Sequence, residues 1–220
     1  MKPIQLAMTG LGGAAAAAVL AAAAAWAPRA SSATIRDLEV DKHRGRYELV
    51  ANAFLDASPR SIYAVLTDYE DNAFRRISSV YKESDYLEPA QDGTPIVYTR
   101  MEGCLMWYCV SMRRVERLES REPYFIRTVT LPEQSDFTHS VSEWILEPVD
   151  GGTRMTYRLE MEPDFWVPPV IGPWYLKRTL STGGIRAVNR IERLAREIDA
   201  LQQSITETAA APDASAGGQR

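Results

Sequence analysis

Apolar and polar residues alternate along much of the chain between residues 46 and 161, in short runs separated by turn-forming residues. The clearest run is 153–161, where Met155, Tyr157 and Leu159 alternate with polar side chains. A period of two is typical of a strand with one buried face. Because the intervening turns have hairpin length, the pattern predicts an antiparallel sheet. The predicted strands are 46–54, 80–87, 95–101, 107–118, 124–131, 137–146 and 153–161.

Two short helices are predicted between the first and second strands. Ser58 is a good N-cap residue and Pro59 suits the first helical position, so a helix is expected from there to about Asp68. A second short helix is expected around 72–77. The inward residues of the first helix are expected to be Ile62, Val65 and Leu66.

A single long helix is predicted after the last strand, from Pro169 or Pro173 to Gln202. Its apolar residues recur at spacings of three and four, which places them on one side of a helix. The tail 203–220 is rich in Ala, Gly, Ser and Asp and is expected to be disordered. The apolar stripe comprises Leu176, Leu180, Gly183, Gly184, Ala187, Ile191, Leu194 and Ile198.

The first 33 residues have the order of a secretory signal peptide. Lys2 is followed by an apolar stretch over 4–27 and then by small residues up to Ala33, after which cleavage is expected. The alternative is an uncleaved membrane anchor, for which the stretch is long enough. Cleavage predicts an exported, periplasmic protein whose mature chain begins with a polar leader over 34–44, followed by one domain over 45–202.

The charge of the chain excludes some partners. Its formal net charge is -4, and without Lys2 and Arg29 it has 23 basic and 29 acidic side chains, or -6. Because non-specific nucleic-acid binding requires many phosphate-neutralising cations, we expect no nucleic-acid partner. The same balance disfavours a polybasic membrane-surface binder.

Three segments resemble the START-like superfamily of polyketide cyclases, lipid-transfer proteins and coenzyme Q-binding proteins. They are Ala-Ser-Pro-Arg-Ser-Ile-Tyr-Ala-Val-Leu-Thr-Asp-Tyr at 57–69, Glu-Trp-Ile-Leu-Glu-Pro at 143–148 with Gly-Gly-Thr-Arg-Met-Thr-Tyr at 151–157, and the closing helix, with Pro-Pro at 168–169 through Leu180 and Ile-Glu-Arg-Leu-Ala at 191–195. The resemblance covers about 45–200 and implies the α+β helix-grip fold, a seven-stranded curved antiparallel sheet around a long C-terminal helix. It also implies a hydrophobic ligand, although members of one fold differ in function.

A strongly curved sheet cannot close fully onto one helix, so we expect a cavity between them. Gly183 and Gly184 each lower helix stability by about 1 kcal/mol relative to Ala. Their missing side chains leave room for a ligand or allow a strand to approach; tight helix–sheet packing or a local kink is the alternative. The lining residues could instead simply fill the core. The predicted lining is Val97, Thr99, Ser142, Trp144, Met155, Tyr157, Leu159, Met161, Leu180, Gly184 and Ala187, with Trp166, Ile171 and Trp174 at the mouth, where they could also contact a membrane or an envelope protein.

Cys104 and Cys109 are the only cysteines, and an exported chain favours a disulfide between them. In one extended strand they would lie roughly 17 Å apart, so the bond requires a turn between them. The four residues of that turn, 105–108, are apolar or aromatic, which is unusual for a turn. Two free thiols are the alternative.

Other candidate chemistry is sparse. His43 and His139 are the only histidines, too few for a structural zinc site or a His-based triad, and we expect both at the surface. Arg100, Glu102 or Arg127 could anchor a ligand inside the cavity, but an outward position is preferred for each. The sequence has no phosphate-binding glycine-rich loop and no nucleophile elbow, so we expect no cofactor and no metal.

These observations favour binding or transport of a small hydrophobic ligand, such as an isoprenoid, quinone, fatty acyl or sterol-like compound. No catalytic residue is identified, so binding is preferred over catalysis. One alternative is a cyclase or dehydratase, which would need a buried acid–base or charged pair at the cavity floor. Another is an envelope module that binds a protein in its groove.

Overall fold

The computed structural model describes residues 34–43, 45–105, 108–165 and 172–210. For 34–38, 40–43, 105, 108, 172–181 and 210 it describes the backbone alone. One antiparallel sheet of eight strands has the order β1-β2-β8-β7-β6-β5-β4-β3. The strands are β1 (Thr34–His43), β2 (Arg46–Leu55), β3 (Tyr81–Leu87), β4 (Ile96–Leu105), β5 (Tyr108–Arg121), β6 (Phe125–Thr130), β7 (Phe137–Val149) and β8 (Gly152–Pro163).

All seven predicted strands are present, and β1 adds an eighth at the sheet edge. β1 forms a hairpin with β2, in which Lys42 pairs with Tyr47 and Val40 with Leu49. The polar segment 34–44, predicted as a leader, therefore contributes an edge strand. Its charged residues are typical of an edge, where they discourage pairing with another sheet.

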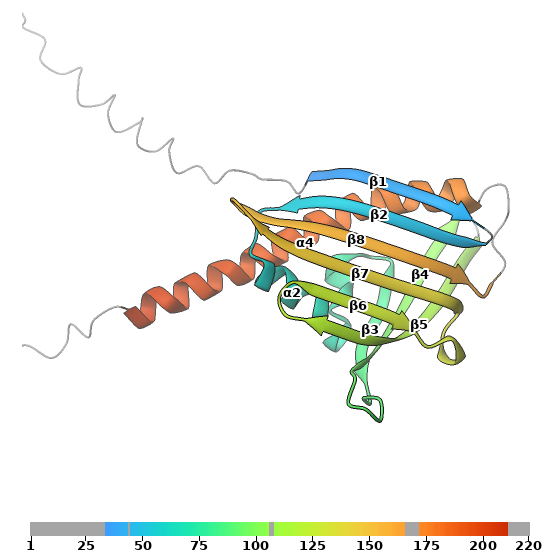
Figure 1. The fold of residues 1–220 in the computed structure, drawn as a ribbon, viewed down its shortest axis with the longest axis horizontal. Coiled ribbons are helices and arrows are strands. Elements are labelled where there is room, and N and C mark those ends of the chain that lie inside the picture. Colours follow the sequence, from blue (N-terminus) through green and yellow to red (C-terminus); the bar gives the residue numbers. More distant parts are fainter. Residues whose placement is uncertain (1–33, 44, 106–107, 166–171, 211–220) are drawn as a thin grey trace, which may run out of the picture. The chain divides into compact units, whose positions relative to one another are not determined.

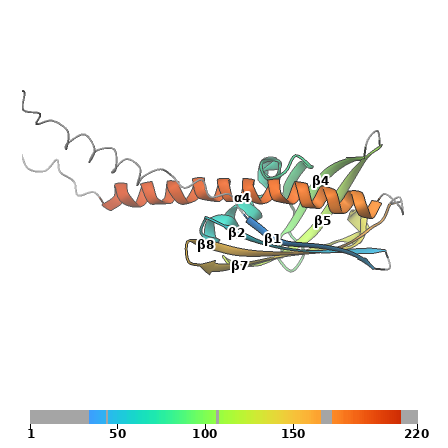
Figure 2. The ribbon, with the colours of Figure 1, turned by 90° about the horizontal axis from the view of Figure 1, so that it is seen from above.

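The long helix α4 (Gly172–Ala210) lies across the curved sheet. Strands β1, β2, β7 and β8 lie on one side of it, and β4 and β5 rise along another side, so the sheet wraps around the helix (Figures 1 and 2). The predicted curved antiparallel sheet around a C-terminal helix is thereby confirmed.

The C-terminal end of α4 projects beyond the sheet (Figure 2). The helix continues to Ala210, so residues 203–210, predicted as part of a disordered tail, are helical. Extending an existing helix costs little because nucleation is already complete. The Thr206 and Thr208 hydroxyls also donate to backbone carbonyls one turn earlier.

The connection between β2 and β3 contains the two predicted short helices, α2 (Pro59–Thr67) and α3 (Phe74–Ile77), with the 3-10 helix η2 (Glu70–Asn72) between them. Ser58 caps α2, since its side chain accepts a hydrogen bond from the Ser61 backbone N–H. Ile62, Val65 and Leu66 are buried, which confirms the inward side of this helix. A further short helix, η3 (Pro132–Gln134), follows β6.

One hydrophobic core joins α2, α3 and the middle of α4, from Val188 to Ala195, to the sheet. On the sheet its members share one phase: Leu55 pairs with Thr153 and Ala53 with Met155, and all are buried. The turn between β7 and β8 is the predicted Gly151-Gly152 turn; Gly151 has φ 79°, which glycine adopts without strain. Large side chains of this core include Leu55, Ile62, Tyr69, Phe74, Ile126, Leu146 and Ile191.

Candidate functional site

A row of polar side chains crosses the inner face of the sheet, which is the face that also carries the core. Thr99 on β4 pairs with Arg114 on β5, and Glu116 pairs with Thr130 on β6. Because Val129 pairs with Val141, Thr130 and Ser140 are opposed at the end of the β6–β7 ladder. We call Thr99, Arg114, Glu116, Thr130 and Ser140 the polar row; all five are buried.

Arg114 and Glu116 form an ion pair within the polar row. The Arg114 Nη2 to Glu116 Oε2 distance is 3.1 Å, and the two side chains are only 8% and 1% exposed. The other Glu116 oxygen accepts a hydrogen bond of 3.0 Å from the Thr128 hydroxyl. Both carboxylate oxygens therefore have a partner, as a buried carboxylate requires.

Several atoms of the polar row have no hydrogen-bond partner. They are the Oγ1 atoms of Thr99 and Thr130, the Oγ of Ser140 and the Nε of Arg114. A buried polar atom without a partner costs about 1–3 kcal/mol. Four such atoms on neighbouring strands therefore mark a place where a bound molecule or water would be stabilised.

Three tyrosines lie close enough to the ion pair to interact with it electrostatically. Burial raises the pKa of the Tyr157 hydroxyl, and the neighbouring Tyr81 hydroxyl acts in the same direction. Burial likewise raises the pKa of Tyr69 and of Tyr81. For Arg114, burial alone would lower the pKa, but Glu116 and these tyrosines outweigh burial and raise it. At neutral pH the tyrosines are therefore uncharged and Arg114 is cationic.

Helix α4 leaves open space beside Gly183 and Gly184. Val188 and Ile191 pack in the core, and Gly184 lies one turn earlier on the same side of the helix. A Cβ atom added at Gly183 or Gly184 would meet no atom within 4 Å. Close approach of a strand to these two glycines is therefore excluded.

The structure places the predicted lining residues of the sheet on its inner face. Val97 and Thr99 on β4 and Ser142 on β7 are fully buried, and they alternate with outward residues. Trp144 and Tyr157 pair across β7 and β8 with ring centroids 4.9 Å apart. Met155, Leu159 and Met161 share the phase of Tyr157, and Ala187 is half-buried on α4.

The predicted mouth lies outside the described residues. Trp166 and Ile171 fall in the undescribed segment 166–171, and for Trp174 and Leu180 only the backbone is described. Their roles therefore stay predictions.

The buried ion pair does not involve any of the charged residues that the sequence offered as ligand anchors. Arg100 and Glu102 pair with each other on the outer face at 2.8 Å, and Arg127 pairs there with Glu119 at 3.1 Å. The outward position preferred for each is confirmed. Arg114 and Glu116 were missed, although the signal is present: they lie in phase between Met112 and Leu118, so that one strand face carries two charges between apolar residues.

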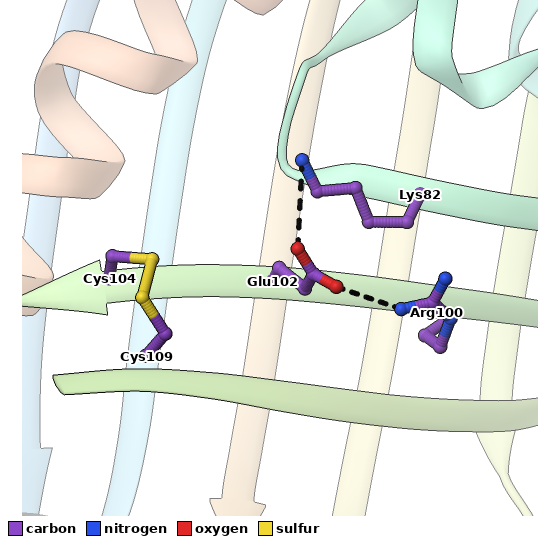
Figure 3. The surroundings of a disulfide bond; sticks show 5 residues. All are labelled: Lys82, Arg100, Glu102, Cys104 and Cys109. Carbon is purple, nitrogen blue, oxygen red and sulfur yellow. Dashed lines mark hydrogen bonds and ion pairs between the residues drawn. A yellow bond between two sulfur atoms is a disulfide. The ribbon is translucent and has the colours of Figure 1, made fainter.

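The predicted disulfide is present at the end of the β4–β5 hairpin. Cys104 pairs with Cys109 across the two strands with their Cα atoms 4.0 Å apart, so the chain reverses between them. Both residues are exposed. The bond lies on the outer face, in phase with Glu102 and Arg100, and Glu102 also pairs with Lys82 (Figure 3).

A separate hollow of about 720 Å³ lies on the outer face at the opposite end of β4. Leu87, Ile96 and Leu131 contribute its apolar surface. The Arg117 guanidinium at its edge already donates to Asp92 at 2.5 Å and to Thr94 at 2.9 Å. Among the described residues, none of the buried polar atoms without a partner lines this hollow.

Two further properties concern the described part of the chain. Within it, no group of His, Cys, Asp and Glu side chains could hold a metal ion. Among its helices, none has the length and apolar character needed to cross a membrane. His139 is half-buried on the outer face, with its Nε2 3.6 Å from a Glu160 oxygen, and the side chain of His43 is not described.

Comparison with known proteins assigns this arrangement to a family. Residues 46–199 match the family model described as polyketide cyclase / dehydrase and lipid transport. No curated protein matches the chain in sequence.

Solved structures share the fold at low sequence identity. A STAR-related lipid transfer protein from Xanthomonas axonopodis is 17% identical with a TM-score of 0.52, over 71% of this chain and 98% of its own. The ZhuI aromatase/cyclase from Streptomyces sp. R1128 is 14% identical with a TM-score of 0.52, over 69% and 94%. A START superfamily protein from Mycobacterium smegmatis is 19% identical with a TM-score of 0.52, over 67% and 98%.

Proposed function

The chain belongs to the polyketide cyclase/dehydrase and lipid-transport family, and we propose on that premise that it binds and carries a small hydrophobic molecule between its sheet and α4. The observation that carries the proposal is the polar row with its four unpartnered buried atoms, on the inner face of a sheet whose helix leaves open space at Gly184. The apolar body of the ligand would lie against the surrounding Met and aromatic side chains. Burial of apolar surface, worth about 25 cal/mol per Å², would drive uptake.

The space beside Gly184 provides a direct test. Nile red, a neutral dye that fluoresces in apolar surroundings, serves as the probe. Gly184→Phe would fill the space and is expected to weaken Nile red binding at least about 10-fold, since a site without volume loses the contacts of its ligand. Gly184→Ala is the matched control, because it removes the same glycine with little added volume.

The outcomes of this test are distinct. Binding by the wild type and Gly184→Ala, with loss in Gly184→Phe, supports a ligand between sheet and helix. Equal binding by all three variants would place the dye elsewhere and contradict the proposal. Native mass spectrometry of the purified protein should also show a co-purifying hydrophobic compound that organic solvent removes.

A cyclase or dehydrase activity is a second candidate. The observation that favours it is the buried Arg114–Glu116 pair among Tyr69, Tyr81 and Tyr157, because charged pairs and perturbed hydroxyls gather at catalytic sites. The measurement is mass spectrometry of a soluble poly-β-carbonyl compound incubated with the protein. Loss of water that disappears in Glu116→Gln would favour catalysis, whereas an unchanged compound would leave binding as the function.

We further propose that the protein acts in the cell envelope after removal of residues 1–33. The signal-like sequence and the exposed Cys104–Cys109 disulfide support this location, since disulfides persist in oxidising compartments. Contact of the mouth segment with a membrane or an envelope protein would then deliver the ligand. N-terminal sequencing of protein from the periplasmic fraction tests the cleavage, and a retained Met1 would contradict it.

A further inference from the structure

We propose that the ligand space selects molecules whose polar end is a neutral carbonyl or hydroxyl group, and that it rejects carboxylates and phosphates. This inference rests on the proposed function and specifies the chemical class of the ligand's polar end. The feature that carries it is the internal charge balance of the polar row, together with the kind of hydrogen-bonding atoms left without partners there.

The positive charge of the polar row is already neutralised. Arg114 and Glu116 are in contact at 3.1 Å and almost fully buried, so their charges cancel within the site. The surrounding Tyr69, Tyr81 and Tyr157 stay protonated because burial raises the pKa of each. An anion that reached Arg114 would therefore also lie close to Glu116, and in a buried site water does not screen the repulsion.

The unpartnered atoms suit an uncharged oxygen. The Arg114 Nε–H can only donate, and the Thr99, Thr130 and Ser140 hydroxyls can donate or accept. A ketone, quinone or ester oxygen accepts from such donors, and an alcohol can both donate and accept. Each of these groups would satisfy the row without adding charge, which a buried and already neutral site favours.

The side chains around the polar row determine what apolar body the ligand can have. Met101 and Met112 pair across β4 and β5 on the same face, immediately beyond Arg114. Phe137 is buried, and its ring centroid lies 6.0 Å from the Arg114 guanidinium carbon. Adaptable methionines and an aromatic ring fit a bulky apolar body next to the polar end.

Three probes with the same alkyl chain test the preference for a neutral polar end. 2-Heptadecanone, methyl hexadecanoate and hexadecanoic acid would compete with Nile red at pH 8, where the free acid is ionised. For the wild type, the ketone and the ester are expected to displace the dye at concentrations at least about 10-fold lower than the acid does. Acid binding as tight as ketone binding would overturn the inference but leave the proposed function intact. Failure of Nile red and all three probes to bind would instead overturn the proposed function.

Exchange of the buried carboxylate should invert the preference. In Glu116→Gln the Arg114 charge is no longer cancelled, so the acid is expected to gain at least about 10-fold relative to the ketone. Glu119→Gln is the matched control, since Glu119 lies on the outer face of the same strand and should leave the ratio unchanged. An unchanged ratio in a folded Glu116→Gln protein would contradict the role of Glu116.

A second variant covers the case in which Glu116→Gln does not fold. Arg114→Gln combined with Glu116→Gln leaves the row uncharged and is expected to keep the wild-type preference for the ketone. A gain in acid binding by this double variant would also contradict the inference. The wild-type comparison remains decisive by itself, since it needs no substitution.

Discussion

Asp199 on α4 accepts hydrogen bonds from both the backbone N–H and the hydroxyl of Ser58, the residue that caps α2. The N to Oδ2 distance is 2.9 Å and the Oγ to Oδ1 distance is 2.7 Å. The Ser61 hydroxyl donates to the same carboxylate at 2.6 Å. One side chain of the long helix therefore joins the start of α2 to α4, at the end of the domain that holds the packed core.

Asp199→Ala is expected to destabilise the protein by about 2 kcal/mol, because three donors lose a charged acceptor, each such bond being worth about 1.5–3 kcal/mol when well buried. Thermal unfolding should show a fall in Tm of about 4–8 °C. Glu197→Ala, on the exposed side of the same turn, is the control and should leave Tm within about 1 °C. Equal effects of the two substitutions would contradict a stabilising role for the hydrogen bonds that Asp199 accepts.

The same carboxylate makes stability depend on pH. Burial raises the pKa of Asp199, but the hydrogen bonds from Ser61 and Ser58 outweigh burial and lower it below the ordinary value of 3.8. Its contribution is fully present above that value and is lost as the pH falls through the lower pKa of the folded state. Urea unfolding from pH 6 to 2 should therefore show a shallower loss of stability in Asp199→Asn than in the wild type. If the stability of the two proteins falls in parallel as the pH decreases, Asp199 is not the source of this pH dependence.

The buried ion pair should respond differently to single and double substitution. Arg114→Met leaves Glu116 buried without its cation and is expected to cost about 3–5 kcal/mol. Arg114→Met with Glu116→Leu should recover most of that loss, because an apolar pair needs no compensation. The outer pair Arg127–Glu119 has the same separation of 3.1 Å but is exposed, so Arg127→Met should cost less than about 1 kcal/mol. Chemical denaturation measures the stability of all three variants. A double variant that is less stable than Arg114→Met would contradict an energetic coupling between Arg114 and Glu116.

The disulfide should stabilise the β4–β5 hairpin through its short closed loop. Replacing both Cys104 and Cys109 by Ser is expected to lower stability by about 2 kcal/mol, the value that chain entropy gives for a short loop. A reductant should lower the Tm of the wild type and leave the double variant unchanged. Intact mass with and without reductant provides the control, since the oxidised protein is about 2 Da lighter; a mass that does not change would show free thiols.

The local sequence was sufficient for most of the fold. Alternation in 153–161, the Ser58-Pro59 start of α2 and the Gly151-Gly152 turn each depend on a few neighbouring residues, and each prediction is confirmed. The secondary structure of segments with weaker patterns could not be predicted from the local sequence. The strand 34–43 is polar because it lies at an edge, and residues 203–210 continue a helix whose nucleation occurred elsewhere.

In the candidate site, too, some features follow from the local sequence and others only from the tertiary structure. Periodicity by itself determined which residues of β4, β7 and β8 face inward, since side chains alternate across a strand whatever its partners are. Only the tertiary structure decided which polar groups meet inside: the pairing of β5 with β4 and with β6 brings Arg114 and Glu116 next to Thr99 and Thr130. Whether two side chains share a buried, weakly screened space depends on strand register and on the sheet curving around α4, and neither is a property of any local stretch of sequence.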